Sequence, residues 1–192
     1  NYTFDTYLDY VQQGIYLWEN SPYVKNYPEL YFLNYVLFHR TNDEEIKPCR
    51  TYFWKKIKDK VQGKAMVEAA LEINHWCAGE VMYQGTDMRT GSALEIYRSG
   101  VGRCGEEAVF VVNVMRSAGI PARPVYVPRW SHCDDNHAWV EVWCDGDWHY
   151  LGACEPEAVL DKGWFTNAAS RAMMIGSRWY DRAMPDEKVI GK

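Results

Sequence analysis

The chain has 192 residues, of which 47% are hydrophobic and 24% charged, proportions that are ordinary for one soluble globular domain with a sizeable core. The net charge is −5 and no basic cluster offsets it, which argues against a nucleic-acid partner, and no apolar run approaches the roughly 20 residues needed to cross a membrane. Six cysteines without a Cys-x-x-Cys pair are too few for a disulfide scaffold and argue against a structural zinc site.

The first half of the chain predicts helices separated by turn-rich links. Apolar residues recur at helical spacing in the first segment, and Pro22 and Pro28 interrupt the link that follows it. Pro48 lies inside the third segment, which leaves the start of that helix open. The predicted helices cover residues 4–18, 29–39, 43–60 and 64–77, and residues 79–101, with four glycines, predict loops and turns.

A buried helix is predicted directly after Cys104, over residues 105–118. This segment is apolar almost all round, which is typical of a helix in the centre of a domain. Gly119 and Pro121 give the usual signal for its end. Unpaired N–H groups and the positive end of the helix dipole favour a thiolate over a thiol at the start of such a helix. Cys104 is therefore a candidate nucleophile.

After this helix the hydrophobic pattern takes the period of β-strands. Strands are predicted over residues 122–127, 137–144 and 148–151, and Asp145-Gly146 is a strong two-residue hairpin signal between the last two. Residues 129–136 predict a polar loop, and the tail from residue 164 is irregular, with a helix expected near residues 168–174. Helices followed by an antiparallel sheet indicate an α+β fold.

The chemistry depends on a base that can meet Cys104, and His137 at the start of a predicted strand is the candidate. A thiolate with a nearby imidazole is the minimum for covalent acyl transfer. Two structural alternatives stay open, because a buried cysteine often acts as a small hydrophobe and a strand histidine is often structural. A metal site formed by Cys104, His132, Cys133 and His137 is a further alternative, although nothing in their spacing requires the two pairs to converge.

Three motifs occur in a fixed order in the middle of the chain. They are Gly102-x-Cys104-Gly105, Arg116-x-x-Gly119-Ile120-Pro121-Ala122-Arg123, and His137-Ala138-Trp139-x-Glu141, which is followed by Gly146-x-Trp148. With these motifs, residues 76–155 resemble the transglutaminase-like superfamily of papain-like cysteine enzymes. The resemblance implies a papain-like core over residues 63–165, in which the central helix that carries the cysteine packs on an antiparallel sheet. Residues 1–62 are then expected to form a helical extension, and residues 166–192 a tail that could lead to further domains.

The resemblance also implies Cys104 as the nucleophile, His137 as the general base, and an aspartate four positions after Trp148 that orients the imidazole. This chain has Gly152 at that position. A two-residue hairpin turn would place Cys154 opposite His137 and Gly152 diagonal to it on the same face. The expected position of the acid therefore has no side chain.

Glu155 is the nearest substitute and is the third predicted catalytic residue. Strict alternation directs Glu155 to the other face of the sheet, but Pro156 could end the strand and let the chain turn back. A solvated acid at a strand end is the alternative interpretation of Glu155. Asp134 and Asp135 are further candidates for the third position.

Three tryptophans are predicted to line a substrate cleft, namely Trp76, Trp130 and Trp139. The backbone N–H of Cys104 is the expected oxyanion donor, and the resemblance implies that Trp76 helps there. Packing in the core is the alternative for Trp76 and Trp139.

The resemblance implies a thiol hydrolase without cofactor or metal, which cleaves an amide bond of a peptide or glycopeptide through a thioester. The alternative is a catalytically degenerate module that binds a peptide or glycan, because Gly152 replaces the orienting acid. Superfamily members often occur within larger extracytoplasmic proteins, so a secreted or periplasmic setting and a multidomain chain are expected.

Overall fold

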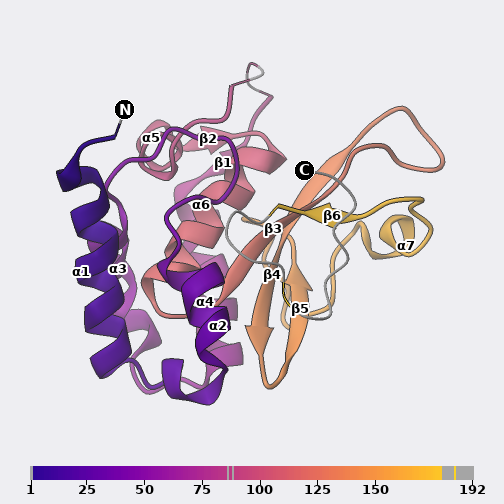
Figure 1. The fold of residues 1–192 in the computed structure, drawn as a ribbon. Helices are drawn as coiled ribbons and strands as arrows, with labels where there is room; N and C mark the ends of the chain where they lie inside the picture. The colour runs from indigo at the N-terminus through magenta and orange to yellow at the C-terminus, as the bar shows by residue number, and fades with distance from the viewer. Residues whose placement is uncertain (1, 86, 88, 179–183, 185–192) are drawn as a thin grey trace.

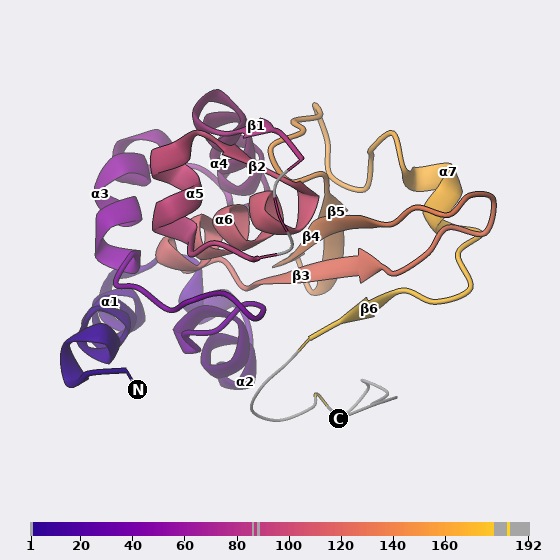
Figure 2. The same cartoon turned by 90° about the horizontal axis from the view of Figure 1, so that it is seen from above.

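The computed structural model describes residues 2–85, 87, 89–178 and 184. Helices occupy one half of the molecule and an antiparallel sheet occupies the other, as Figures 1 and 2 show in two perpendicular views. The predicted α+β fold is thus confirmed. None of the helices in the described part of the chain is both long and apolar enough to span a membrane.

The N-terminal half contains the predicted helices with changed ends. The second helix continues from α-helical into π-helical geometry, and a 3₁₀ turn over Val24–Asn26 precedes it. The segments are α1 (Phe4–Asn20), α2 (Glu29–Phe32), η2 (Leu33–Leu37), α3 (Arg50–Val61) and α4 (Met66–Glu80).

Helix α3 begins at Arg50, two residues after Pro48, so the start that this proline left open lies beyond it and not at residue 43. The carboxylate of Asp9, on α1, accepts hydrogen bonds from the backbone N–H groups of Cys49 and Arg50, at 2.9 and 2.7 Å. A carboxylate at this position satisfies orphan N–H groups and favours a helix start. The cap comes from another helix, and for this reason the local sequence could not place the boundary.

Helix α5 (Ala93–Ser99) lies in the stretch that was predicted to be loop. Its start is a capping box, in which Ser92 and Glu95 exchange hydrogen bonds with each other's backbone N–H. Gly100, with φ of 69°, ends it in the left-handed conformation. The prediction of a loop here was wrong, because the Ser-x-x-Glu capping box starts a helix between the glycines. Short strands β1 (Met82–Tyr83) and β2 (Val101–Gly102) pair in parallel around this helix.

Helix α6 (Cys104–Ser117) is the centre of the fold, as its apolar sequence predicts, and every residue from Glu106 to Ser117 is buried. It packs against α3, α4 and α5 on one side and strands β3 and β4 on the other. At its end, Ile120 N–H donates to the Met115 carbonyl and Gly119 N–H to the Arg116 carbonyl, both at 3.1 Å. This Schellman motif requires positive φ, which Gly119 adopts at 82°.

The main sheet has the strand order β5-β4-β3-β6. Strands β3 (Ala122–Val127) and β4 (His137–Cys144) have their predicted bounds, β5 (Asp147–Leu151) starts one residue early, and β6 (Gly176–Ser177) was not predicted. Cys144 pairs with Asp147 across a turn in which Asp145 and Gly146 both have positive φ, so the predicted hairpin and its register are confirmed.

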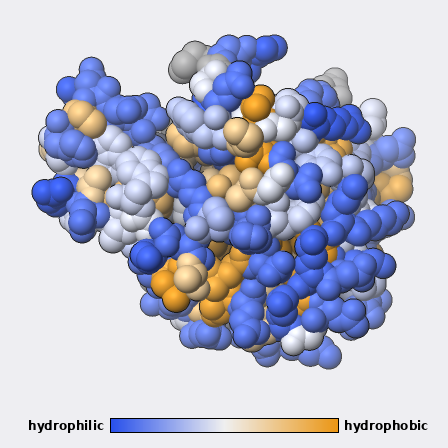
Figure 3. Space-filling model, turned by 180° about the vertical axis from the view of Figure 1, so that it is seen from behind, coloured by the Kyte–Doolittle hydropathy of each residue, from blue (hydrophilic) through white to orange (hydrophobic). Residues whose placement is uncertain are grey.

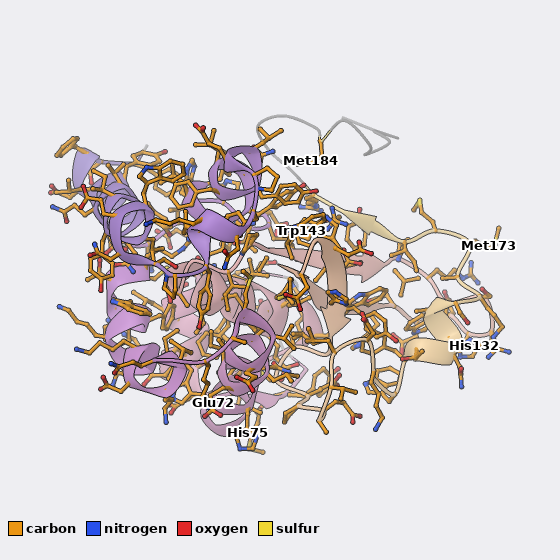
Figure 4. All side chains as sticks on the ribbon, turned by 90° about the horizontal axis from the view of Figure 1, so that it is seen from below. Glu72, His75, His132, Trp143, Met173 and Met184 are labelled. Atoms are coloured by element: carbon orange, nitrogen blue, oxygen red, sulfur yellow. The ribbon has the colours of Figure 1, made fainter. Side chains whose placement is uncertain are left out.

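One hydrophobic core joins the N-terminal helices to the sheet. For example, the rings of Tyr31 on α2 and Trp143 on β4 lie 4.1 Å apart, and Figure 4 shows Trp143 between the sheet and the helices. The back surface in Figure 3 is mainly hydrophilic, with apolar residues in limited patches. Of the predicted tail, residues 166–169 form the short helix α7 (Thr166–Ala169), and residues 179–183 and 185–192 lie outside the described residues.

Candidate active site

Cys104 and His137 line the same cavity, which has a volume of about 310 Å³. Helix α6 presents the cysteine from its first residue, and β4 presents the histidine from its first residue. The backbone N–H groups of Ala138 and Gly105 lie close enough to the Cys104 sulfur to lower the pKa of its thiol. Because Ala138 directly follows His137, the N-terminal end of β4 lies against the thiol. The remaining lining residues include Arg103, Asn136 and the strand residues Pro124–Val127.

Burial raises the pKa of the Cys104 thiol above its ordinary value. The N–H groups of Ala138 and Gly105, together with the guanidinium of Arg103, lower that pKa but do not outweigh burial, and nearby Glu107 raises it further. The net direction is opposite to the one expected from the helix N-terminus alone. Desolvation destabilises the thiolate here by more than the two amide donors and the arginine stabilise it.

His137 is buried among aromatic rings. Its imidazole centroid lies 4.7 Å from the ring of Trp164 and 5.0 Å from that of Phe165, with Trp130 and Trp139 at 6.2 and 6.1 Å. Burial lowers the pKa of His137 to about 4, although nearby Asp135 acts in the opposite direction. The imidazole is therefore neutral at pH 7, and a neutral imidazole is the form that accepts a proton. Within the described part of the chain, its buried Nε2 atom has no hydrogen-bond partner.

A tight turn follows β5 at the position where the resemblance implies an acid. Glu155 N–H donates to the Gly152 carbonyl at 3.1 Å, and Cys154 has a φ of 58°. Asn74 on α4 fixes the turn from both sides, since its Nδ2 donates to the Gly152 carbonyl and its Oδ1 accepts from Cys154 N–H. The strand therefore ends before Glu155, and the alternation that would have directed this side chain to the other face does not apply.

The carboxylate of Glu155 occupies the space that a side chain at position 152 would fill. A Cβ built on Gly152 would lie 2.5 Å from Glu155 Oε2 and 2.9 Å from Glu155 Cβ. Both carboxylate oxygens accept from the indole Nε1 of Trp164, at 3.0 Å each. Burial raises the pKa of Glu155, and the hydrogen bond from Trp164 lowers it in part.

Glu107, one helical turn beyond Cys104, is a second buried carboxyl group in this region. Burial, reinforced by the charge of Glu155, raises the pKa of Glu107 to about 8. Glu107 is thus mainly protonated at pH 7, and it raises the pKa of the Cys104 thiol only to the extent that it is ionised.

The three predicted cleft tryptophans do not line the cavity. Trp76 packs against the rings of Tyr97 and Phe110, at 6.0 and 6.1 Å. Trp139 is buried and stacks on Phe165 at 4.9 Å, and Trp130 is buried in the same aromatic cluster. The structure thus places these three side chains in packing positions, of which Trp130 and Trp139 support His137.

The four residues considered as metal ligands also do not come together. His132 lies on the loop beside α7, at the end of the molecule away from the N-terminal helices (Figure 4). Cys133 is exposed on the same loop. Among the described residues, no group of three or more His, Cys, Asp or Glu side chains is arranged to hold a metal ion.

Two residues at the site were missed in the sequence. Arg103 precedes Cys104, and its guanidinium donates to the carbonyls of Asp87 and Arg89 and to the hydroxyl of Thr90, which holds these residues against the start of α6. Its Nη1 would lie 2.9 Å from a Cβ on Gly105, so this glycine leaves room for the arginine. Trp164 gave no local signal, because only the turn at Gly152 brings Glu155 within reach of it.

Comparison with family models gives a match to the transglutaminase-like superfamily over residues 55–153. Comparison with curated proteins gives no match. Among solved structures, a candidate cysteine protease from Cytophaga hutchinsonii is similar, with 20% identity, a TM-score of 0.45, and coverage of 70% of this chain and 52% of that one. LapG from Legionella pneumophila is similar as well, with 17% identity, a TM-score of 0.47, and coverage of 64% and 68%. The chain thus spans about half of the Cytophaga protein and about two thirds of LapG.

The matched region contains Cys104, His137 and the motifs between them. It comprises 99 of the 192 residues, which is more than half of the chain. The protein therefore belongs to the transglutaminase-like superfamily.

Proposed function

We propose that the protein is a thiol-dependent hydrolase that cleaves an amide bond in a peptide or glycopeptide. The observation that carries this proposal is that Cys104, at the start of α6, and His137, at the start of β4, line the same cavity together with Ala138. Two groups that suffice for acyl transfer thus face one space that a substrate can enter.

In the proposed reaction, His137 takes the proton of the Cys104 thiol as the sulfur attacks the carbonyl carbon of the amide. The resulting oxyanion accepts a hydrogen bond from the backbone N–H of Cys104, which has no hydrogen-bond partner within the helix because it lies in the first turn. The C–N bond then breaks, the imidazolium protonates the leaving amine, and an acyl thioester on Cys104 remains. Water attacks this thioester with His137 again as the base, which releases the acid and restores the thiol.

The directions of the two pKa shifts favour this general-base route over a preformed ion pair. Burial raises the pKa of the Cys104 thiol and lowers that of His137 to about 4, so both groups are neutral in the resting site. Proton transfer then accompanies attack on the substrate, and removal of the base is expected to cost about 10²–10⁴-fold in acylation rate.

The test begins with acylation of Cys104 by p-nitrophenyl acetate, followed by release of p-nitrophenolate and by mass spectrometry. We expect a thioester on Cys104 in the parent protein, none in Cys104→Ala, and much slower acylation in His137→Ala. A panel of peptide and glycopeptide amides then identifies substrates by release of the amine. No Cys104-dependent acylation or turnover in either assay would contradict the proposal, and amine exchange in place of hydrolysis would redirect it to transamidation.

A second candidate is a binding module that no longer catalyses. It is favoured by Gly152 at the position of the orienting acid and by the unpartnered Nε2 of His137. In that case the Cys104→Ala variant would bind a peptide or glycan in the cavity as tightly as the parent does, and neither protein would cleave it. For either function we propose a secreted or periplasmic setting within a larger chain.

A further inference from the structure

The imidazole of His137 is held by ring contacts and not by an acid. Among the described residues, no carboxylate bonds its Nε2, which is buried, and Trp164 and Phe165 are the rings closest to it. Phe165 is fully enclosed and belongs to the same cluster as Trp139, so the surrounding core fixes it. Trp164 is 65% exposed, and core packing therefore does not fix it. Another interaction has to hold this indole against His137.

That interaction is the bond from Trp164 Nε1 to the carboxylate of Glu155. Glu155 is itself held rigidly, since its N–H bonds the Gly152 carbonyl and Asn74 fixes the turn. The absence of a side chain at Gly152 leaves the space that the carboxylate occupies. The glycine that removes the acid of the family thus also makes room for the group that anchors the indole.

We propose that Trp164 is the positioning residue of this site, and that Glu155 acts on His137 through the Trp164 indole. The indole, anchored at Nε1, covers one side of the imidazole and holds it in the orientation in which it takes the proton from Cys104. This inference rests on the proposed function for its catalytic meaning, but the arrangement itself can be measured without any reaction.

The inference assigns Glu155 a hydrogen-bond role that does not require its charge. A glutamine at position 155 keeps an oxygen that accepts from the indole, whereas an alanine removes the acceptor. If Glu155 instead paired with the imidazolium of His137 directly, the charge would be essential, and a glutamine would fail as an alanine does. The two roles therefore predict opposite results for one conservative substitution.

The first measurement is the titration of the His137 ring by ¹H–¹³C NMR in a Cys104→Ala background, which is independent of activity. The covered imidazole is expected to titrate near pH 4. Trp164→Phe, which loses the Nε1 donor, and Glu155→Ala should both raise the pKa of His137 toward its ordinary 6.5, because water reaches the loosened ring. Glu155→Gln should titrate as the parent does, and Glu157→Ala, which removes an exposed acid two residues away, serves as the matched control.

The second measurement is acylation of Cys104 by p-nitrophenyl acetate in the parent background. We expect Trp164→Phe and Glu155→Ala each to be slower by about five- to tenfold, the loss that corresponds to one hydrogen bond. The double variant should be no slower than either single one, since both substitutions break the same link. Glu155→Gln should stay within about twofold of the parent. Thermal unfolding of each variant reports whether it is folded.

The inference is overturned if Glu155→Gln behaves like Glu155→Ala, because Glu155 then acts through its charge. It is equally overturned if Trp164→Phe leaves both the titration and the acylation rate unchanged. If no variant or parent is acylated at all, the proposed function fails, while the NMR titration still decides whether Trp164 and Glu155 position the ring.

Discussion

A methyl group added at Gly152 should destabilise the protein in its natural sequence and stabilise it once Glu155 is removed. The Cβ of Gly152→Ala would lie 2.5 Å from Glu155 Oε2 and 2.9 Å from Glu155 Cβ, both closer than atoms normally approach. Forcing an extra carbon into such a space costs about 1–3 kcal/mol. Gly152 does not have positive φ, so alanine restricts the unfolded chain without strain and returns about 0.4–1 kcal/mol. The net loss is about 1–2 kcal/mol, or about 2–8 °C in melting temperature for a domain of this size.

In a Glu155→Gly background both close atoms are gone, and the same Gly152→Ala change should raise the melting temperature slightly. The four proteins are compared by thermal unfolding followed with circular dichroism at one pH, which completes a double-mutant cycle. The sign of the effect should reverse between the two backgrounds. Equal effects of Gly152→Ala with and without Glu155 would refute the view that the carboxylate occupies the place of the missing side chain.

Three further variants test the electrostatics and the frame of the fold. The pKa of Glu107 is raised from 4.5 to about 8 in the folded state. Protonated Glu107 therefore stabilises the fold below about pH 4.5, and this contribution is lost as the pH rises to about 8. When melting temperature is measured against pH, Glu107→Gln should show a smaller decline over this range than the parent. Arg116→Met should cost about 3–5 kcal/mol in urea unfolding, because the buried carbonyl of Ala122 and the part-buried carbonyl of Arg40 lose their donor and the Phe38 carbonyl keeps only Arg50. Arg98→Met, at an exposed position, should change stability by less than about 0.5 kcal/mol. Asp9→Ala should cost about 1–2 kcal/mol by removing the cap of α3, and a stability equal to the parent would contradict that role.

The parts of the fold that local sequence determines were predicted well. The hairpin follows from Asp145-Gly146, whose positive φ values suit a primed turn, and the central helix follows from its continuous apolar run and its Gly119 stop. The start of α3 was not predicted, because its cap is the carboxylate of Asp9, 41 positions before Arg50. Contacts of this range leave no trace in a local pattern.

The candidate site divides in the same way. Cys104 and His137 lie in motifs with a fixed order, and the structure places them on one cavity. The net direction of the thiol pKa could not be predicted from the helix N-terminus, because burial depends on how β4 and α6 pack. The contact between Trp164 and Glu155 could not be predicted from the sequence, because it depends on a turn at Gly152 that directs Glu155 away from the line of the strand.

The glycine at position 152, where the family resemblance implies an aspartate, raises the question of how the proposed base works without an orienting acid. An aspartate bonded to the imidazole would raise the pKa of His137 and favour the imidazolium, and with it a resting thiolate. In this chain burial among aromatic rings lowers the pKa of His137 to about 4, so the imidazole is neutral at pH 7. A neutral base next to a neutral thiol needs no counter-charge at rest, but its ring still has to be held in one orientation. A ring contact can meet that requirement as a hydrogen bond does, and in the proposed arrangement the anchored Trp164 indole takes the place of the acid that Gly152 lacks.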